Sequence, residues 1–421
     1  MRLSQLFTKT TKNVPADETA RNAQLLIQAG YIHKEMAGVY AYLPLGLRVL
    51  ENIKRIVREE MNAVGGQEVM MTALQPRDIW EKTDRWDDAK VDNWFKTKLK
   101  SGAELGVGLT HEEPIVDALS GYVDSYKDLP IYIYQIQNKF RNELRAKSGL
   151  LRGREFVMKD MYSLARSQEE HEKLYDQVIK AYYKVYDRLG LGDKTYRTYA
   201  DGGIFTDRFS DEFQTLTDIG EDTIYVDEAA RIAINEEVYT DENLAKLGLD
   251  KSKLVKKRGV EVGNTFHLET KYTDALGVYY TDENGQRQPI IMGCYGIGIS
   301  RLMGMLAEYF ADERGLVWPE AVAPAKVYLA RLGDDPAVVK QADELYEKLT
   351  KAGVETLYDD RDARPGEKFA DADLMGIPYR LVVSKKTREA GVYELKSRQS
   401  TEVEQLGEVE VMKALAAAGQ T

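Results

Sequence analysis

The sequence predicts an α+β protein in two parts, and three observations support that prediction. Beyond residue 322, short apolar strands alternate with helices, a pattern typical of a small α/β domain with a partly parallel sheet. Residues 131–162 form a long predicted β-hairpin with charged residues on both arms. A strand over 289–294 then leads through glycines into a helix over 299–310. Residues 1–322 are therefore expected to hold a mainly antiparallel sheet flanked by helices.

The composition excludes several classes of protein. Hydrophobic residues make up 43% and charged residues 30% of the 421 residues, which excludes a disordered chain. We expect no membrane span and, from the polar N-terminus, no secretion signal. A single cysteine excludes an internal disulfide and favours a reducing, cytoplasmic compartment, and the four scattered histidines predict no metal-ligating residues. The net charge of −11 argues against nucleic-acid binding through bulk charge, although a local basic surface remains compatible with it.

The C-terminal part carries clear signals for where helices start and stop. Asp335 is a predicted N-cap with Pro336 at the first helical position, and Gly353 ends that helix. The other predicted elements are strands at 327–330, 354–358 and 377–384 and helices at 367–374 and 408–417. Pro319 and Pro324 bracket the linker, so we place the second domain at residues 323–421.

The N-terminal part begins its sheet after a long helix. Apolar residues from Leu47 to Val64 keep helical spacing, and Gly65-Gly66 ends the helix. A strand is predicted over Gln67–Gln75, closed by Pro76. The glycines of residues 293–298 are expected to turn the chain before the helix at 299–310.

The hairpin concentrates charge. Arg141 and Glu143 lie on one face of its first arm. Residues 141–160 hold six positive and three negative side chains, although the whole chain is acidic. A solvated ladder of salt bridges explains such a hairpin about equally well. The functional interpretation is a guanidinium fixed for a phosphate, with a carboxylate beside it. The chain has no GxxxxGK[ST] loop, which excludes P-loop chemistry.

The hairpin resembles motif 2 of class II aminoacyl-tRNA synthetases, which reads Phe-Arg-x-Glu, a variable loop, then Arg-x-x-x-Phe. Residues 47–76 resemble motif 1, and residues 289–310, with Gly296-Ile-Gly-Ile-Ser-Arg301, resemble motif 3. Thr110-His-Glu-Glu113, Arg154-Glu-Phe-Val-Met-Lys-Asp160 and Gly293-Cys-Tyr-Gly296 are similar to segments of bacterial-type prolyl-tRNA synthetases. The resemblance implies a class II catalytic domain followed by an anticodon-binding α/β domain.

By this resemblance, the chain is expected to join L-proline to tRNA(Pro) through a prolyl-adenylate, with ATP as substrate, Mg²⁺, and a homodimer formed through motif 1. Arg141 would bind the α-phosphate and the substrate carboxylate, and Arg301 the γ-phosphate. Glu143 would accept from the adenine amine, and Phe156 would stack under the ring. The implied catalytic residues are Arg141, Glu143 and Arg301, and the ATP site adds Arg152, Phe156, Glu261 and Asn264.

For proline, Glu112 is the expected partner of the ammonium group, with the Thr110 hydroxyl beside it on one face of a strand. The alternative for Thr110 is an ordinary helix N-cap. The ring pocket would be lined by Met158, Phe266 and Cys294, residues that are otherwise core positions.

For tRNA, the resemblance assigns Arg145 to the acceptor end and Arg361, Glu367 and Lys368 to the anticodon. A solvated surface cluster is an equally good interpretation of each of these four residues taken singly.

Three departures from the resembled family matter. Residues 215–260 are too few for the usual editing insertion, so a short linker and no cis-editing are expected. Alanine would then be rejected by pocket fit alone, which is worth about 10–200-fold, unless a separate trans-editing protein acts. Residues 202–209 differ from the usual glycine- and serine-rich run, and Glu269 stands where relatives usually have glycine.

Two other identities remain open from the residues. One is another synthetase of the same subclass, threonyl or glycyl, although a threonyl enzyme needs a zinc site that this chain cannot easily build. The other is a non-catalytic synthetase-like protein that only binds nucleic acid. The presence of Arg141, Glu143 and Arg301 favours the catalytic interpretation.

Overall fold

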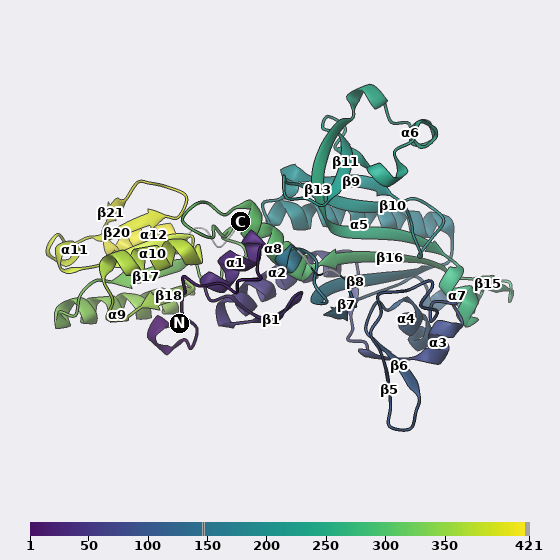
Figure 1. The fold of residues 1–421 in the computed structure, drawn as a ribbon, viewed down its shortest axis with the longest axis horizontal. Coiled ribbons are helices and arrows are strands. Elements are labelled where there is room, and N and C mark those ends of the chain that lie inside the picture. Colours follow the sequence, from purple (N-terminus) through teal and green to yellow (C-terminus); the bar gives the residue numbers. More distant parts are fainter. Residues whose placement is uncertain (145, 147, 417–421) are drawn as a thin grey trace. The chain divides into compact units, whose positions relative to one another are not determined.

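The computed structural model of the chain describes residues 1–144, 146 and 148–416 (Figure 1). These residues fall into two compact units, one of residues 1–53, 148–150 and 303–416, the other of residues 54–144, 146 and 151–302. The sequence instead predicts a single boundary near residue 322, and as functional domains those bounds remain a prediction. Fold class is confirmed: mainly antiparallel strands with helices, and a separate α/β sheet.

The second unit is built on a nine-stranded sheet with the order β10-β9-β12-β11-β13-β16-β8-β7-β3. All neighbours in this order are antiparallel except β3–β7 and β12–β9, so the predicted antiparallel character is confirmed. The strands are β3 (Gln67–Glu68), β7 (Ile131–Phe140), β8 (Glu155–Ala165), β9 (Thr195–Ala200), β10 (Ser210–Leu216), β11 (Asp222–Asp227), β12 (Ile232–Asn235), β13 (Val255–Glu269) and β16 (Ile291–Gly298).

Helix α5 (Gln168–Arg188) packs against β8 and β16 and covers one face of this sheet. The Ser167 hydroxyl caps its N-terminus by accepting from the Glu170 amide. On the other face, the register sets Asp160 beside Gly296 and Cys294 beside Phe266. Because side chains alternate along a strand, these residues share the face that α5 leaves free.

Shorter elements surround that free face. Helices α3 (Arg77–Glu81) and α7 (Lys271–Leu276) both pack on α4 (Glu112–Leu119). A small sheet has the order β4-β6-β5, and a hairpin pairs β14 with β15. Their bounds are β4 (Leu74–Pro76), β5 (Lys96–Lys98), β6 (Glu104–Val107), β14 (Tyr279–Thr281) and β15 (Arg287–Pro289).

The predicted strand over residues 67–75 is broken. It divides into β3, which pairs with β7, and β4, which pairs with β6 in the small sheet. Between them, side-chain amides replace the backbone ladder: Gln135 accepts from the Met71 amide at 3.1 Å and Gln137 donates to the Met71 carbonyl at 2.6 Å. The predicted helix before it is confirmed as α2 (Pro44–Ala63).

The glycines of residues 293–298 do not turn the chain, so that prediction is wrong; β16 runs through them to Gly298. Their role is close packing. A Cβ on Gly293 would lie 2.5 Å from the Tyr295 hydroxyl, and one on Gly296 would lie 2.6 Å from Asn264 Oδ1. Helix α8 (Ile299–Tyr309) follows directly.

Residues 215–260, expected as a linker, are folded. They supply β11 and β12 to the large sheet and add the short helix α6 (Asp241–Leu247). Thr240 caps α6 by accepting from the Asn243 amide, and Gly248 ends it with a φ of 68°. The segment therefore extends the sheet rather than spanning a gap.

The C-terminal sheet of the first unit has the order β18-β17-β19-β20-β21 and is parallel over its first three strands, as predicted. Asp335 caps α9 by accepting from the Ala337 amide at 2.8 Å, also as predicted. Residue 417, the predicted end of the last helix, lies outside the described residues. The elements are β17 (Val327–Arg331), α9 (Pro336–Lys351), β18 (Thr356–Asp359), α10 (Pro365–Met375), β19 (Tyr379–Val383), α11 (Lys385–Glu389), β20 (Tyr393–Ser397), β21 (Glu404–Leu406) and α12 (Glu408–Ala416).

The N-terminal residues of the same unit form α1 (Arg21–Gln28) and a hairpin of β1 (Ile32–Met36) and β2 (Val39–Tyr42). Within the described part of the chain, no helix combines the length and the apolar character that crossing a bilayer requires.

The backbone conformation at Glu269 explains why glycine is usual at this position in the resembled family. Its φ is +52°, at a bulge of β13, and its carboxylate pairs with Arg208 at 2.5 Å. A side chain in this left-handed region costs about 1–2 kcal/mol. Both Glu269→Gly and Glu269→Ala lose the ion pair, but only glycine relieves the backbone.

We expect Glu269→Gly to be more stable than Glu269→Ala by about 1 kcal/mol in urea unfolding. Equal stability of the two variants would show that the left-handed backbone carries no cost here.

Candidate active site

Arg141 is a partly buried cation beside an aromatic ring. It follows β7, where its backbone amide donates to the Arg154 carbonyl at 2.8 Å. The guanidinium lies 5.2 Å from the centre of the Phe156 ring, and across the described residues it makes no hydrogen bond or ion pair. Burial first, then the positive charge of Arg301, lowers the pKa of Arg141. Such a cation is suited to an anionic ligand.

Arg301 is held from two directions at the start of α8. Its Nε donates to the Leu151 carbonyl at 2.8 Å, and its Nη1 donates to the Glu261 carbonyl and lies 3.0 Å from the Glu261 carboxylate. Because its charge acts on the pKa of Arg141, the two guanidiniums interact electrostatically. The structure therefore places the two predicted arginines in one electrostatic environment.

The predicted adenine contact, Glu143, is already engaged. Its carboxylate accepts from Arg152 Nε at 3.1 Å and Nη2 at 2.8 Å, and its carbonyl accepts from Arg154 at 3.0 Å. These bonds join the two arms of the hairpin where the loop leaves the sheet. Arg152 thus positions the carboxylate of Glu143.

Thr110 and Glu112 meet, but not as residues of one strand. Chain order places Thr110 in the loop after β6, while Glu112 is the first residue of α4. The predicted strand geometry is wrong because β6 ends at Val107, and the N-cap position belongs to His111. The expected proximity is nevertheless present: the Thr110 hydroxyl lies 2.9 and 2.8 Å from the two carboxylate oxygens of Glu112.

Arg85 is a site residue that sequence reasoning missed. It is 3% exposed, and its Nη1 lies 3.3 Å from Glu112 and 3.0 Å from Glu113. Its guanidinium also faces the rings of Trp80, Phe205 and Tyr272 at 5.0, 5.1 and 5.4 Å. A lone arginine between an aspartate and a tryptophan carries no motif that could have revealed this role.

The predicted ring pocket is partly assembled. Phe266 and Cys294 are register partners on adjacent strands, and the Cys294 thiol lies 3.3 Å from the Glu112 carboxylate. Met158 pairs with Gly298 on the same face, farther along the sheet. Phe266 and Cys294 also belong to the hydrophobic core, so they are core residues as well as candidates for the wall of the ring pocket.

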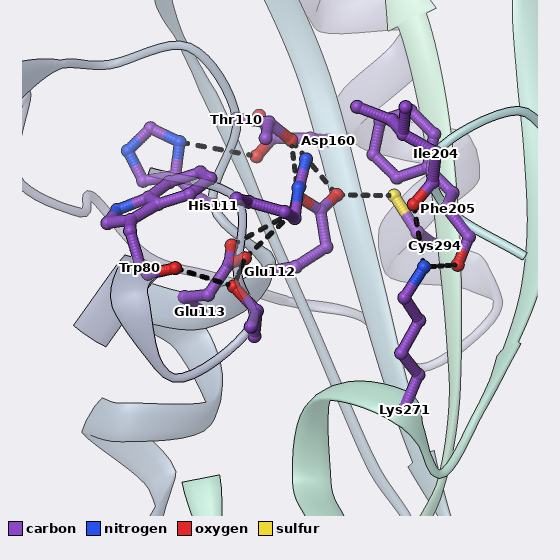
Figure 2. A network of polar contacts seen from close by, with 12 residues as sticks. Trp80, Thr110, His111, Glu112, Glu113, Asp160, Ile204, Phe205, Lys271 and Cys294 are labelled. Atoms are coloured by element: carbon purple, nitrogen blue, oxygen red, sulfur yellow. Dashed lines mark hydrogen bonds and ion pairs between the residues drawn. The ribbon is translucent and has the colours of Figure 1, made fainter. Parts of the chain in front are cut away.

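Residues 202–209 lie against this pocket. The Phe205 ring is 4.7 Å from the Phe266 ring, and Lys271 of α7 donates to the carbonyls of Ile204 and Phe205 at 2.7 and 3.3 Å (Figure 2). The segment that departs from the family pattern therefore packs against Phe266, one of the residues predicted to line the ring pocket.

A network of buried charged and polar side chains lies next to Glu112, around its neighbour His111. Lys139, wholly buried, lies 2.8 Å from the Asp160 carboxylate and 2.7 Å from His111 Nδ1. Asp160 also accepts from Gln135 and the Tyr162 hydroxyl at 2.9 and 2.8 Å. Burial and the Lys139 charge lower the pKa of His111 to about 4, so its ring is neutral at physiological pH. Sequence reasoning assigned no role to any of these residues, although His111 and Asp160 lie in segments that carry the family resemblance.

Glu261 pairs with Arg301, and a second carboxylate, Glu212, lies close enough to Glu261 for the two charges to interact. Burial, followed by the negative charge of Glu261, raises the pKa of Glu212 to about 8. Gln214 and Asn235 donate to Glu212 at 2.8 and 3.1 Å, and Asn264 donates to Glu261 at 2.8 Å. In the described residues no three metal-ligating side chains cluster. Nucleotide-bound Mg²⁺ commonly uses only one or two carboxylates besides phosphates, so this pair fits it.

Glu212 gives a prediction on pH. Its raised pKa means that the folded state binds more protons than the unfolded state between pH 4.5 and 8, so its contribution to stability falls as pH rises through that range. We expect Glu212→Gln to gain stability relative to the parent protein between pH 6 and 9 by at least about 1 kcal/mol, the value of one pKa unit. Urea unfolding at the two pH values measures this, and a constant difference would refute the linkage.

The predicted tRNA contacts in the C-terminal sheet are only partly available. Lys368 is 1% exposed and donates to three backbone carbonyls at 2.6 to 3.2 Å, so its ammonium group is already engaged, and its assignment to the anticodon stays a prediction. Arg361 is paired with Asp359 and Asp371 at 2.8 and 2.7 Å. Glu367 is exposed. Arg145 lies outside the described residues.

Comparison with known families gives two matches in chain order. Residues 95–310 match the tRNA synthetase class II core domain (G, H, P, S and T), and residues 326–418 match an anticodon binding domain.

Curated relatives match over the whole length. A proline–tRNA ligase of Anaplasma phagocytophilum (strain HZ) is 38% identical over 429 residues, covering 99% of this chain and 100% of that protein. One from Geobacillus sp. (strain WCH70) is 34% identical over an alignment of 552 positions, covering 96% of this chain and 97% of its own length. Since that alignment is longer than this chain, the Geobacillus protein carries segments with no counterpart here.

Among solved structures, a prolyl-tRNA synthetase of Cryptosporidium parvum complexed with halofuginone and AMPPNP has the same fold. Its TM-score is 0.77 at 17% identity, and the match covers 94% of this chain and 76% of that one.

Proposed function

The chain belongs to the proline–tRNA ligase family of class II tRNA synthetases, and we propose that it joins L-proline to tRNA(Pro) at the expense of ATP, through a prolyl-adenylate. The observation that carries the proposal is the Arg141 guanidinium on the hairpin beside the sheet face that bears Cys294 and Phe266; it is partly buried and makes no hydrogen bond or ion pair with the residues that the structure describes. A cation for the phosphate and a carboxylate for the ammonium are the two charges that the reaction requires.

In the first step, the proline carboxylate attacks the α-phosphorus of ATP in line and pyrophosphate leaves. Arg141 binds the carboxylate and the α-phosphate bidentately, and Arg301 binds the γ-phosphate. Bound Mg²⁺ would be held by Glu212 and Glu261 and would neutralise phosphate charge. In the second step, a terminal hydroxyl of the tRNA attacks the mixed anhydride and displaces AMP. Neither step needs a protein nucleophile, so catalysis consists of positioning and charge stabilisation.

Amino-acid-dependent ATP–pyrophosphate exchange with each of the twenty amino acids tests the proposal. Proline should give the highest kcat/KM. Exchange specific for threonine or glycine would assign the chain to another member of the class, and no exchange with any amino acid would support a protein that only binds nucleic acid.

We infer further that the chain has no cis-editing activity. Residues 215–260 are occupied by β11, β12 and α6, and the 552-position alignment with the longer Geobacillus relative supports this. A pocket that accepts proline rejects the smaller alanine by only about 10–200-fold.

We therefore expect alanine-dependent exchange within about 200-fold of the proline kcat/KM, and stable alanyl-tRNA(Pro) in the absence of other proteins. Hydrolysis of preformed alanyl-tRNA(Pro) by the purified protein would contradict the absence of editing. If the protein does not hydrolyse alanyl-tRNA(Pro), a separate trans-editing protein would be the route by which the mischarged tRNA is cleared.

We also propose a cytoplasmic homodimer formed through residues 47–76. Within that region Leu47, Met70 and Leu74 are 46%, 83% and 56% exposed, unusual for large apolar side chains. Light scattering of Met70→Glu against the parent protein tests the dimer, and an unchanged mass would place the interface elsewhere.

A further inference from the structure

The two oxygens of the Glu112 carboxylate have different neighbours. Oε2 lies 3.3 Å from Nη1 of Arg85, whereas Oε1 lies 3.3 Å from the Cys294 thiol (Figure 2). The Thr110 hydroxyl is close to both, at 2.9 Å from Oε1 and 2.8 Å from Oε2. Because a hydroxyl has a single proton, it donates to one of these oxygens at a time. One oxygen of the carboxylate is therefore engaged by a guanidinium, and the other is next to a residue of the predicted ring pocket.

Arg85 is held by its surroundings rather than by many hydrogen bonds. Its Nη1 reaches Glu112 and both oxygens of Glu113, the latter at 3.0 and 3.1 Å. Its Nε and Nη2 are buried and have no partner among the residues that the structure describes. Three aromatic rings face the guanidinium at 5.0, 5.1 and 5.4 Å, those of Trp80, Phe205 and Tyr272. A cation enclosed by rings in this way has little freedom to turn, so Glu112 Oε2 stays engaged.

This arrangement limits the acceptors that a substrate nitrogen can meet. With Oε2 engaged, the strong acceptors left are Glu112 Oε1 and Thr110 Oγ1, and no described residue donates to that hydroxyl oxygen. The secondary ammonium of proline carries two N–H donors, and the primary ammonium of alanine carries three. Two acceptors satisfy the first and leave one N–H of the second unpaired, which is costly for a charged group in a buried site.

We propose that Arg85 makes the amino-acid site selective for a secondary over a primary ammonium group, by holding Glu112 Oε2 so that two strong acceptors face the substrate. Arg85 acts through Glu112 and is thus a specificity-determining residue without contact to the substrate. The inference rests on the proposed function, because it concerns the same proline site. It gives the rejection of alanine a second source besides the size of the pocket.

The test removes the guanidinium without changing the net charge of the site. Burial raises the pKa of the Glu113 carboxyl to about 6, so at pH 8 Glu113 is ionised and the trio of Arg85, Glu112 and Glu113 is negative by one charge. Arg85→Met/Glu113→Gln removes one charge of each sign and leaves Glu112 Oε2 free to accept. If this variant does not fold, Arg85→Met/Glu113→Met, which places two apolar side chains there, gives the same measurement.

Amino-acid-dependent ATP–pyrophosphate exchange at pH 8 is measured with proline, alanine and N-methylalanine. N-Methylalanine has a secondary ammonium group but no ring, so it separates the number of N–H donors from the fit of the ring. In the parent protein we expect a higher kcat/KM for N-methylalanine than for alanine. In the double variant we expect the kcat/KM ratios of proline to alanine and of N-methylalanine to alanine each to fall about tenfold, because the third N–H of alanine gains an acceptor.

Two controls isolate this effect. Glu113→Gln keeps the guanidinium beside Glu112 and should retain both ratios within about twofold of the parent. Arg398→Met/Asp312→Asn removes a different buried arginine, one that is 4% exposed, lies 2.6 Å from its carboxylate partner and belongs to the other unit of the chain. This control should also leave both ratios unchanged.

The outcomes separate the two proposals. If the parent protein shows no proline-dependent exchange, the proposed function fails. If the double variant loses activity equally with all three amino acids, Arg85 has only a structural role, and the inference on selectivity fails alone. A fall in the proline ratio without a fall in the N-methylalanine ratio assigns Arg85 to the shape of the ring pocket and also overturns the inference. A parent protein that activates alanine better than N-methylalanine overturns it as well.

Discussion

Replacing Arg141 with lysine is expected to lower the kcat/KM of proline-dependent ATP–pyrophosphate exchange by about 10²–10³-fold, the usual loss when one fixed donor to a developing charge is removed. Lysine keeps the positive charge but cannot make two parallel bonds to a carboxylate and a phosphate. The loss should appear mainly in kcat, because the bidentate contact strengthens as charge develops at the α-phosphorus.

Stability should move in the opposite direction from activity. The Arg141 guanidinium makes no polar contact with the described residues, and the charge of Arg301 opposes its own. Arg141→Gln removes that repulsion, so we expect its midpoint in urea unfolding to equal or exceed that of the parent protein. Replacing an arginine with a structural role would instead lower the midpoint, because its buried hydrogen-bonding partners would be left unsatisfied.

Arg166→Lys is the matched control. Arg166 pairs with Glu170 on the surface, where such pairs contribute about 0–1 kcal/mol, and we expect exchange within about twofold of the parent. If Arg141→Lys retained full exchange activity, the assignment of Arg141 to the α-phosphate would be wrong.

The features that the sequence predicted well are those encoded locally. The hairpin follows from alternation and charge within residues 131–162, and the Asp335 cap from two adjacent residues. Each depends on neighbours a few positions away, which a reader of the sequence can see. The grouping of Phe266 with Cys294 came from the family resemblance, and the structure places the two residues as register partners on adjacent strands.

Sequence reasoning misled where contacts between residues far apart in the chain determine the local conformation or the burial of a side chain. The glycines of residues 293–298 are typical of a turn, yet they are needed because Tyr295, His171 and Asn264 crowd the strand. Lys368 is polar and sits on a predicted helix, yet carbonyls of Arg331, Asp359 and Arg361 bury its ammonium group. No local pattern carries such contacts.

The second large effect is expected from Glu112. Glu112→Gln should lower kcat/KM for proline by at least about 100-fold while the KM for ATP changes less than about threefold, since breaking a buried charged pair costs about 2–5 kcal/mol. The charges around Glu112 explain why its negative charge is not fully neutralised by the protein. Lys139 and Asp160 balance one another, whereas the single guanidinium of Arg85 faces two carboxylates, Glu112 and Glu113.

Glu113→Gln is the control that separates recognition from general electrostatics. It makes the same change of charge on the same helix, next to the same arginine, but Glu113 points to Thr83 and Arg85, while Glu112 contacts Thr110 and the Cys294 thiol. One negative charge in this trio is left without a cation, and the secondary ammonium of proline would supply it. Because Glu112 is the carboxylate in contact with the pocket wall, Glu113→Gln should change the KM for proline by less than about fivefold, well short of the cost of an unpaired buried charge. Equal losses in both variants would mean that the pocket senses only its net charge, and that Glu112 does not bind the ammonium group itself.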